Sequence, residues 1–172
     1  PMSQKAFLRA GYTATSLLMS YINPEIESEY NKGGERLGLS VSVKVLDKDS
    51  KSTIYVPEEI KGFVQKIYER LGMKYDLCQS DEKDDFTEMS AETSTALKMS
   101  KIIVRGAGND IEKEFRQAIM DAIKQKSEMI ELVLCLNSKS CSYAYEVAKK
   151  CDFSLSGIIP GAENGDYIIM QM

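Results

Sequence analysis

Strand-like and helical patterns alternate in the second half of the sequence, and this order limits the folds that the chain can adopt. A strand-like run at 95–104 precedes an amphipathic helical segment at 109–125, and the apolar strand "MIELVLCL" follows at 129–136. A short helix at 142–151 and two more strand-like runs complete the series. Alternating strands and helices that end in two successive strands predict a mixed α/β sheet.

Two of the helices have clear amphipathic patterns. The segment 57–72 has a proline in its first turn and apolar residues on one face, and Gly72 is typical of a helix C-cap. In the helix at 109–125, apolar residues recur every four positions and are expected to face the core. They are Ile111, Phe115, Ile119 and Ile123.

The first third of the chain divides into three parts. Residues 1–22 predict a helix that ends at Gly11 and a strand rich in β-formers. Residues 23–37 contain a proline, several glutamates and a glycine pair, which predicts a loop or linker. An alternating strand then opens the remaining domain, 38–172.

Composition narrows the class of protein. The chain has 172 residues, 43% of them hydrophobic, which suits one principal core. A net charge of −4 without a clustered basic stripe argues against nucleic-acid binding. No apolar run reaches the length of a membrane span, and the N-terminus lacks the apolar core of a secretory signal. We therefore expect a cytoplasmic protein without a nucleic-acid or membrane partner.

The types of reactive side chain limit the possible chemistry. Histidine is absent, which excludes mechanisms built on Ser-His or Cys-His pairs and histidine-ligated metals. The four cysteines have no C-x-x-C spacing and lie in or beside apolar segments, which favours reduced core thiols over disulfides or zinc ligands. We predict no metal site. The acidic stretch 78–94, poor in aliphatic residues, is expected to be a solvated hairpin tip or a mobile loop.

A weak internal repeat links the two ends of the sequence. The segments "AFLRAGYTATSLLMSY" and "VAKKCDFSLSGIIPG" both predict a helix, a tight corner with an aromatic residue and then a strand, at an offset of roughly 140 residues. Residues 1–22 are therefore interpreted as the closing helix and strand of a preceding copy of the same module. Under this interpretation, the partners of the chain would include other domains of a longer protein.

The series "KIIVRGAGNDIEKEF", "LVLCLNSKSCSYAYEVAKKCDF" and "SGIIPGAENGDYIIMQM" resembles the second half of the Gcn5-related N-acetyltransferase (GNAT) fold. The resemblance rests on a strand, a glycine-rich turn that opens a helix, a strand that ends in Asn, a helix and two paired strands. It implies an α+β fold with a mixed, mostly antiparallel GNAT-like sheet flanked by helices on both faces. It also implies transfer of an acetyl group from acetyl-coenzyme A to an amine, on a small molecule or a protein, that the sequence does not identify.

The resemblance places the pyrophosphate of acetyl-coenzyme A on the glycine-rich turn. Free backbone N–H groups and the helix dipole at such a turn attract an anion. Asp110 departs from the family pattern, because it replaces the last small residue of the motif. Two readings remain open: a pyrophosphate cradle, or a structural turn in which Asn109 or Asp110 caps its own helix. The residues implied in cofactor binding are Val104, Arg105, Gly106, Ala107, Gly108, Asn109 and Asn137.

The catalytic acid of the family has no direct counterpart. The position of the family's tyrosine holds Ala148, and Phe7 in the N-terminal copy, while Asp152 replaces a glycine at the corner that follows. Tyr145, or Tyr143 in the same segment, is the candidate substitute for the acid, and packing on the core is the alternative role of both. Two functions follow as hypotheses. The first is an acetyl-coenzyme A-dependent N-acetyltransferase, and the second is a catalytically silent GNAT-like module that binds a ligand or protein within a larger signalling or regulatory protein.

Overall fold

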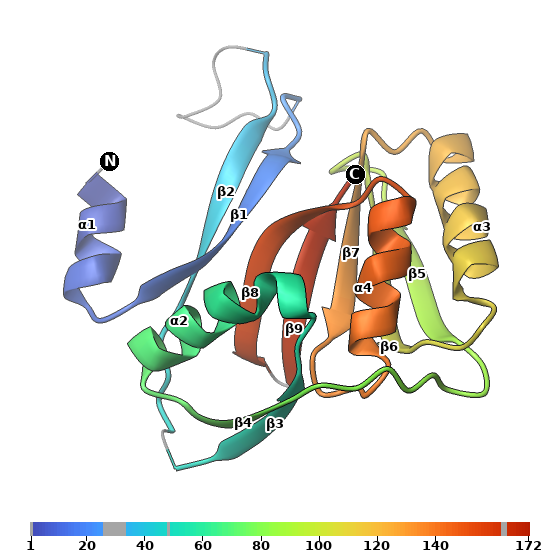
Figure 1. Cartoon of the computed structure of the whole chain (residues 1–172). Coiled ribbons are helices and arrows are strands. Elements are labelled where there is room, and N and C mark those ends of the chain that lie inside the picture. Colours follow the sequence, from blue (N-terminus) through green and yellow to red (C-terminus); the bar gives the residue numbers. More distant parts are fainter. Residues whose placement is uncertain (1, 26–33, 48, 163–164) are drawn as a thin grey trace.

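A seven-stranded sheet forms the centre of the molecule, as a computed structural model shows (Figure 1). The structure describes residues 2–25, 34–47, 49–162 and 165–172. The elements are α1 (Met2–Arg9), β1 (Thr13–Ile22), β2 (Leu37–Val43), β3 (Lys51–Tyr55), the 3₁₀ turn η1 (Glu58–Ile60), α2 (Lys61–Leu71), β4 (Lys74–Cys78), β5 (Glu88–Ser94), β6 (Met99–Gly106), α3 (Ile111–Lys124), β7 (Met129–Cys135), α4 (Cys141–Lys150), β8 (Ser154–Ala162) and β9 (Gly165–Gln171).

The sheet is mixed and mostly antiparallel, as predicted. Its strand order is β2-β1-β8-β9-β7-β6-β5, and only β6 and β7 run parallel to each other. Helix α3 makes the crossover between these two parallel strands, because parallel neighbours cannot be joined by a tight turn. A second, two-stranded parallel sheet is formed by β3 and β4 and lies below the main sheet in Figure 1.

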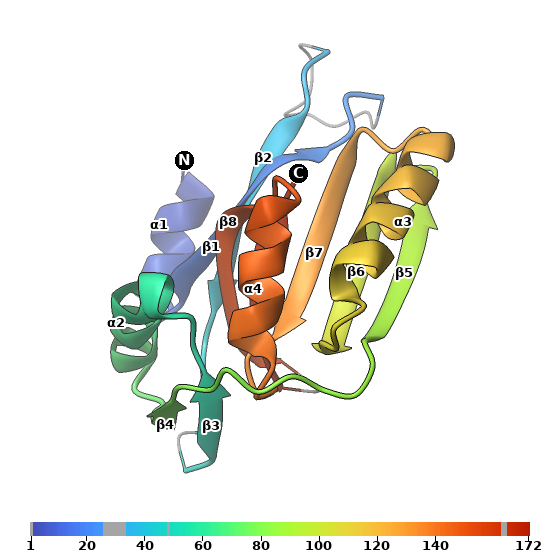
Figure 2. The same ribbon diagram turned by 45° about the vertical axis from the view of Figure 1, so that its right-hand side comes forward.

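Helices α2, α3 and α4 cover one face of the main sheet (Figure 2). Their buried side chains form one core with residues of that face, including Phe115 from α3, Tyr145 from α4 and Leu132 from β7. Helices were expected on both faces, and among the described residues the three helices that enter the main core pack on this one face. The twisted β1–β2 hairpin covers it in part, since Leu18 packs with Val133 and Ile169 in a separate small core.

Strand β1 joins the sheet through a very close approach to β8. The two strands share one paired position, Ser16 opposite Gly157. The hydroxyl of Ser16 donates a hydrogen bond to the carbonyl of Ile158 at 2.8 Å. Gln171 extends the junction, because its side-chain amide donates to the carbonyl of Met19 and its oxygen accepts from the Met19 amide. The side chain of Gln171 thus bridges β1 and β9 where strand pairing between β1 and β8 has ended.

Local signals in the sequence predicted the helices better than the short strands. Helix α2 ends as expected at Gly72, which has the left-handed φ of 68°. The acidic stretch 78–94 contains β5, and neither this strand nor the β3–β4 pair was predicted. Among the described residues, no helix is both long enough and apolar enough to span a membrane.

The junction of β1 and β8 can be tested at Gly157. A Cβ atom there would lie 2.4 Å from both the Cα of Ser16 and the carbonyl oxygen of Thr15, and the φ of 144° disfavours a side chain. We expect Gly157→Ala to lower the free energy of unfolding in urea by about 1–3 kcal/mol, as overpacking does. Gly62→Ala is the matched control, since no atom lies within 4 Å of its Cβ position in α2. The control should stabilise the protein by about 0.5–1 kcal/mol, and equal stability of the Gly157 variant and the wild type would contradict the close approach.

Candidate functional site

The candidate site is the turn between β6 and α3, where two backbone N–H groups already have partners. The amide of Ala107 donates to the Asp84 Oδ2 and to the Ser140 Oγ, both at 2.8 Å. The amide of Gly108 donates to the Thr87 Oγ1 at 3.1 Å. These donors, which an anion at this turn would need, are therefore bound by side chains of the chain itself.

Asp84 is the principal partner of the turn. Its Oδ2 also accepts a hydrogen bond from the Ser140 hydroxyl at 2.6 Å, and its own amide donates to the carbonyl of Ala107 at 2.9 Å. The two glycines of the turn permit this approach. A Cβ on Gly106 would lie 2.7 Å from the Asp84 Oδ2, and a Cβ on Gly108 would lie 2.7 Å from the backbone of Phe86. Because both glycines lack a Cβ atom, the segment before β5 can pack directly against the turn.

Asp110 does not cap helix α3 with its side chain, in contrast to the self-capped reading of the sequence. Although it is the N-cap residue, its carboxylate makes no hydrogen bond to the first turn of the helix. Its Oδ1 instead accepts from the amide and the hydroxyl of Thr87, at 3.0 and 2.6 Å. The hydrogen bond from the Thr87 hydroxyl lowers the pKa of Asp110. The turn is therefore occupied, as a structural turn would be, but by Asp84, Thr87 and Ser140.

The crevice beside the turn is narrow. Strands β6 and β7 pair up to Val104 and Leu134, where their ladder ends. Ser138, Ser140 and Cys141 line the narrow space between the two strand ends, which has no room for a water molecule.

The other residues expected in cofactor binding point in different directions. Val104 is buried in the core, whereas the side chain of Arg105 is exposed. Burial raises the pKa of Tyr167, which packs on the face opposite the helices, and the Arg105 guanidinium offsets part of this rise. The side-chain oxygen of Asn109 accepts a hydrogen bond from Lys83 at 3.0 Å. The turn backbone and the side chains around it thus form no single concave cationic site.

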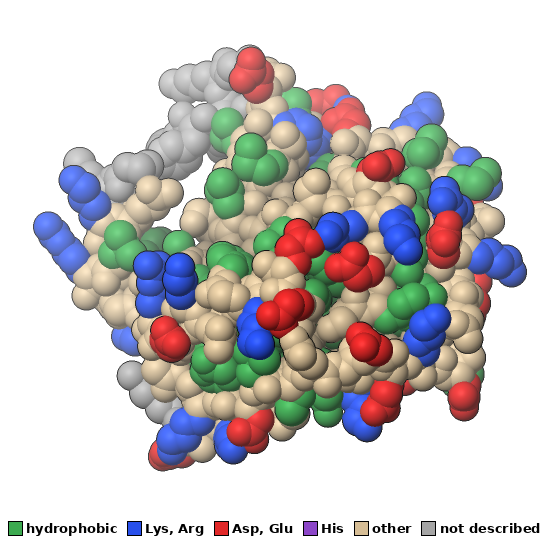
Figure 3. All heavy atoms as spheres, viewed as in Figure 1, with side chains coloured by type: hydrophobic (Ala, Val, Ile, Leu, Met, Phe, Trp, Pro, Cys, Tyr) green, Lys and Arg blue, Asp and Glu red, His purple; other side chains and the backbone are tan. Residues whose placement is uncertain are grey.

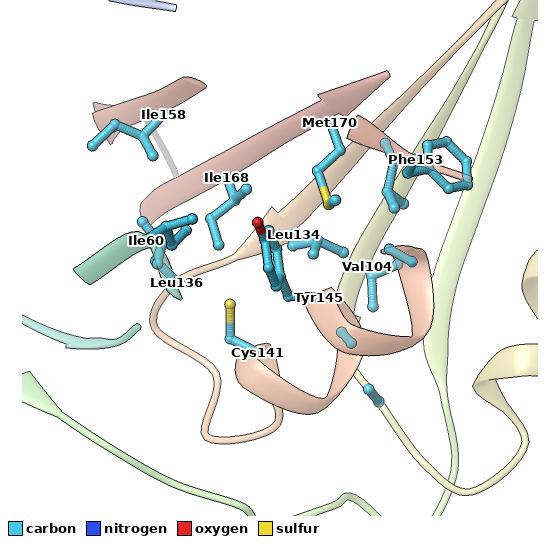
Figure 4. Packing of buried hydrophobic residues seen from close by; sticks show 14 of the residues in the cluster. Ile60, Val104, Leu134, Leu136, Cys141, Tyr145, Phe153, Ile158, Ile168 and Met170 are labelled. Atoms are coloured by element: carbon cyan, nitrogen blue, oxygen red, sulfur yellow. The ribbon is translucent and has the colours of Figure 1, made fainter. Parts of the chain in front are cut away.

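Tyr145, the candidate general acid, lies in the core (Figure 4). Its ring packs beside Leu134 and Ile168, and only 2% of the residue is exposed. Burial raises the pKa of the phenol, and the Glu59 carboxylate raises it further. A phenol with a raised pKa can donate a proton, but a general acid must also reach its substrate, and the ring of Tyr145 is enclosed by core side chains. The ring of Tyr145 thus takes part in the packing of the core.

Asn137 joins three segments of the fold. Its amide nitrogen donates to the Ser52 Oγ at 3.0 Å and to the carbonyl of Thr53 at 2.9 Å, both on β3. Its oxygen accepts from the amide of Asp166 on β9 at 2.8 Å. The carboxylate of Asp166, which is buried, accepts from Ser52 and from the amide of Gly161. Asn137 therefore ties the small sheet to the main one, and these hydrogen bonds do not involve the glycine-rich turn.

Three residues that form the site were not singled out from the sequence. Asp84 and Thr87 belong to the acidic stretch, which was expected to be solvated or mobile, and Ser140 lies in the loop before α4. No local pattern marks a contact between an acidic loop and a turn 23 residues away. The two small residues of the turn, Gly106 and Gly108, were the available signal, because they indicate a close approach without naming what approaches.

We compared the chain with protein-family models, curated proteins and solved structures. Neither a protein-family model nor a curated protein nor a solved structure matches this chain. The interpretation of the site therefore rests on its geometry.

The contacts of Asn137 predict a large effect on stability. Asn137→Ala removes hydrogen bonds to two other segments and leaves the Ser52 and Asp166 groups short of partners. We expect the free energy of unfolding in urea to fall by about 2–4 kcal/mol, because unsatisfied buried polar groups are costly. Asn109→Ala is the control, since its exposed side chain has one hydrogen bond, to Lys83. Similar losses in the two variants would contradict the tethering role.

Asp84 can be compared with a nearby acid of the same charge. Asp84→Ala removes the acceptor of the Ala107 amide and the Ser140 hydroxyl, whereas Asp81 is an exposed residue of the same acidic stretch. We expect Asp84→Ala to destabilise the protein by about 1.5–3 kcal/mol, the range for a hydrogen bond to a charged group, and Asp81→Ala to leave it within about 0.5 kcal/mol of the wild type. Urea denaturation measures both. If the two variants unfold alike, the Asp84 carboxylate does not hold the turn.

Proposed function

We propose that this chain is a GNAT-like module that binds a partner and does not transfer acetyl groups. The observation that carries the proposal is the Asp84 carboxylate on the Ala107 amide. The layout from β5 to β9 supports the GNAT-like interpretation, because it has the element order of the resemblance: a strand, a glycine-rich turn, a helix, a strand that is followed by Asn137, a helix and two paired strands.

Acetyl-coenzyme A does not fit the turn in this conformation. The Asp84 carboxylate takes the donor that a pyrophosphate needs. Two like charges at about 5 Å oppose each other by roughly 3 kcal/mol at an effective dielectric constant near 20. The narrow space between the ends of β6 and β7, which has no room for a water molecule, also disfavours the tail of the cofactor. Asp84 thus acts as an internal anion at the place where the family's cofactor would lie.

The groups available for catalysis support the same conclusion. Acetyl transfer from a thioester benefits from an acid that protonates the departing thiolate and a base that deprotonates the amine. The position of the family's tyrosine holds Ala148, and Tyr145 is enclosed in the core. A chain with its turn bound internally and its candidate acid buried is better suited to binding than to group transfer.

The N-acetyltransferase activity implied by the resemblance is the second candidate. One observation favours it: residues 79–87 form neither helix nor strand, and most of their side chains are exposed. Asp84, Thr87 and backbone contacts connect this segment to the turn. In this second proposal acetyl-coenzyme A displaces the segment and takes the freed amides, and an amine of unknown identity accepts the acetyl group.

Calorimetry with acetyl-coenzyme A separates the two candidates. Under the binding-module proposal the wild type gives no heat of binding at millimolar ligand, because the carboxylate occupies the amide. Asp84→Ala should bind inorganic pyrophosphate or coenzyme A about tenfold or more tightly than Asp81→Ala, since each variant loses one negative charge but only the first frees the donor. Micromolar binding of acetyl-coenzyme A by the wild type would overturn the proposal and support the transferase.

A further inference from the structure

The N-terminal helix and strand repeat the geometry of α4 and β8. Residues 141 positions apart are equivalent, as the two helix ends show: Gly11 follows α1 with a φ of 83°, and Asp152 follows α4 with a φ of 66°. The same pattern of backbone hydrogen bonds closes both helices. In α1 it joins Tyr12 N to Phe7 O and Gly11 N to Leu8 O, and in α4 it joins Phe153 N to Ala148 O and Asp152 N to Lys149 O.

The strands that follow the two helices repeat each other in register. Ala14 pairs with Ser42 on β2, and the equivalent Leu155 pairs with Met170 on β9. Both pairs are followed by a register shift of one residue at the same place. The repeat detected in the sequence at an offset of roughly 140 residues is therefore a structural one, and it extends through β2 and β9.

A local two-fold axis relates two halves of this region. One half is α1, β1 and β2, and the other is α4, β8 and β9. Ser16 and Gly157 are equivalent residues, and they are also each other's partner across β1 and β8. Reciprocal pairing of equivalent positions is the property of a two-fold interface. The order β2-β1-β8-β9 is thus symmetric about its centre, and each position on one side predicts the surroundings of its counterpart.

The two halves differ in what covers them. On one side β9 pairs with β7, and α3 packs on α4. On the other side, the outer edge of β2 pairs with no strand in the part of the chain that the structure describes. Leu17 on β1 is 55% exposed, whereas its equivalent Ile158 is fully buried. On α1, Phe7 and Leu8 are 52% and 62% exposed.

The uncovered half has an apolar surface. Phe7 and Leu8 line a hollow of about 370 Å³ together with Ser40 and Ser42 of β2. Figure 3 shows hydrophobic side chains along α1 and the β1–β2 hairpin beside this hollow. We call α1, β1 and the outer edge of β2 the open half of the sheet.

The composition of β2 indicates that its edge is normally paired. Proteins protect free edge strands with charged residues, because an uncharged edge recruits further strands. The opposite edge of the sheet, β5, carries Glu88 and Glu92. Strand β2 has the sequence LGLSVSV, without a charged residue or a proline. The difference between the two edges favours a partner at β2.

We propose that the open half of the sheet docks a second module that adds a strand antiparallel to β2 and packs a helix against α1, as β7 and α3 do on β9 and α4. The docking strand would present an apolar residue beside Val41, in the position that Val133 takes beside Ile169. A second copy of this chain cannot supply its β7, because that strand is already paired on both edges. We take the partner to be a different module of strand–helix–strand layout, which supplies the counterparts of β7 and α3; a second copy that pairs through its own β2 edge is an alternative outcome of the test below. This inference names the partner class for the binding role proposed above and rests on that role.

Hydrogen–deuterium exchange with a peptide probe tests the docking edge. The probe has the sequence of β7, Met129–Cys135, with two lysines added at each end for solubility. In the free 172-residue chain the amides of β2 should exchange about 100-fold faster than those of β9, because an open edge has low local stability. Millimolar probe should slow exchange in β2 by about tenfold and leave β5 unchanged.

Matched variants show whether the probe binds at the edge that the symmetry predicts. Ser40 and Ser90 are both exposed, on β2 and β5 respectively. We expect Ser40→Lys to abolish the protection of β2. Position 40 is equivalent to Ile168, which is fully buried, so docking would bury the charge of the lysine. Ser90→Lys should have no effect.

Three results would overturn the inference. The first is no protection of β2 by the probe, and the second is equal protection of β2 and β5. The third is slow exchange of β2 in the free chain together with a dimeric mass by light scattering, which would make a second copy the occupant. Acetyl-coenzyme A takes no part in these measurements. A negative result here would therefore contradict the docking inference without testing the proposed function.

Discussion

The hydrogen bonds that Ala107 and Ser140 donate to the Asp84 carboxylate determine what the glycine-rich turn can do. A helix N-terminus attracts an anion, whether this is a phosphate or a side chain. In this chain the acidic segment before β5 supplies the anion, and the glycines of the turn leave room for it. The same geometry that prepares a turn for a nucleotide thus also allows the chain to satisfy it internally.

The internal symmetry gives the rest of the molecule a second organising principle. The junction of Ser16 with Gly157 stands at the centre of a symmetric set of four strands, of which only one side continues into a complete sheet. On that side α4 is buried between the sheet and its neighbours, and on the other side α1 is exposed. We propose one role for these two features, an internally bound turn and an open half of the sheet: the chain contributes a surface for assembly.

The sequence predicted the features that local signals determine. Helix α2 was predicted because Gly72 ends it and its apolar spacing is regular. In α3 the prediction of Ile123 as a core residue was wrong, since it is 64% exposed and Ala122 is buried in its place. A strict four-residue spacing drifts around a helix of about 3.6 residues per turn, so the buried stripe runs through Ile111, Phe115 and Ala122.

The contacts of the site depend on residues distant in sequence. Ser140 meets Ala107 from 33 positions away, and Asn137 meets Ser52 from 85 positions away. The pairing of β3 with β4 likewise requires the whole fold, because each strand has only five residues and no hydrophobic alternation that marks it. The internal repeat was visible in the sequence, since it preserves a helix end and a corner, which are local features.

The most direct measurement of the central claim is the behaviour of the Ala107 amide proton in NMR spectra. If the Asp84 carboxylate binds this amide, its proton exchanges slowly with solvent and its chemical shift stays constant when acetyl-coenzyme A is added. The exchange should become about tenfold to 100-fold faster in Asp84→Ala, because the proton then loses its charged acceptor. Rapid exchange in the wild type, or a shift of the Ala107 resonance that saturates with acetyl-coenzyme A, would contradict an internally occupied turn.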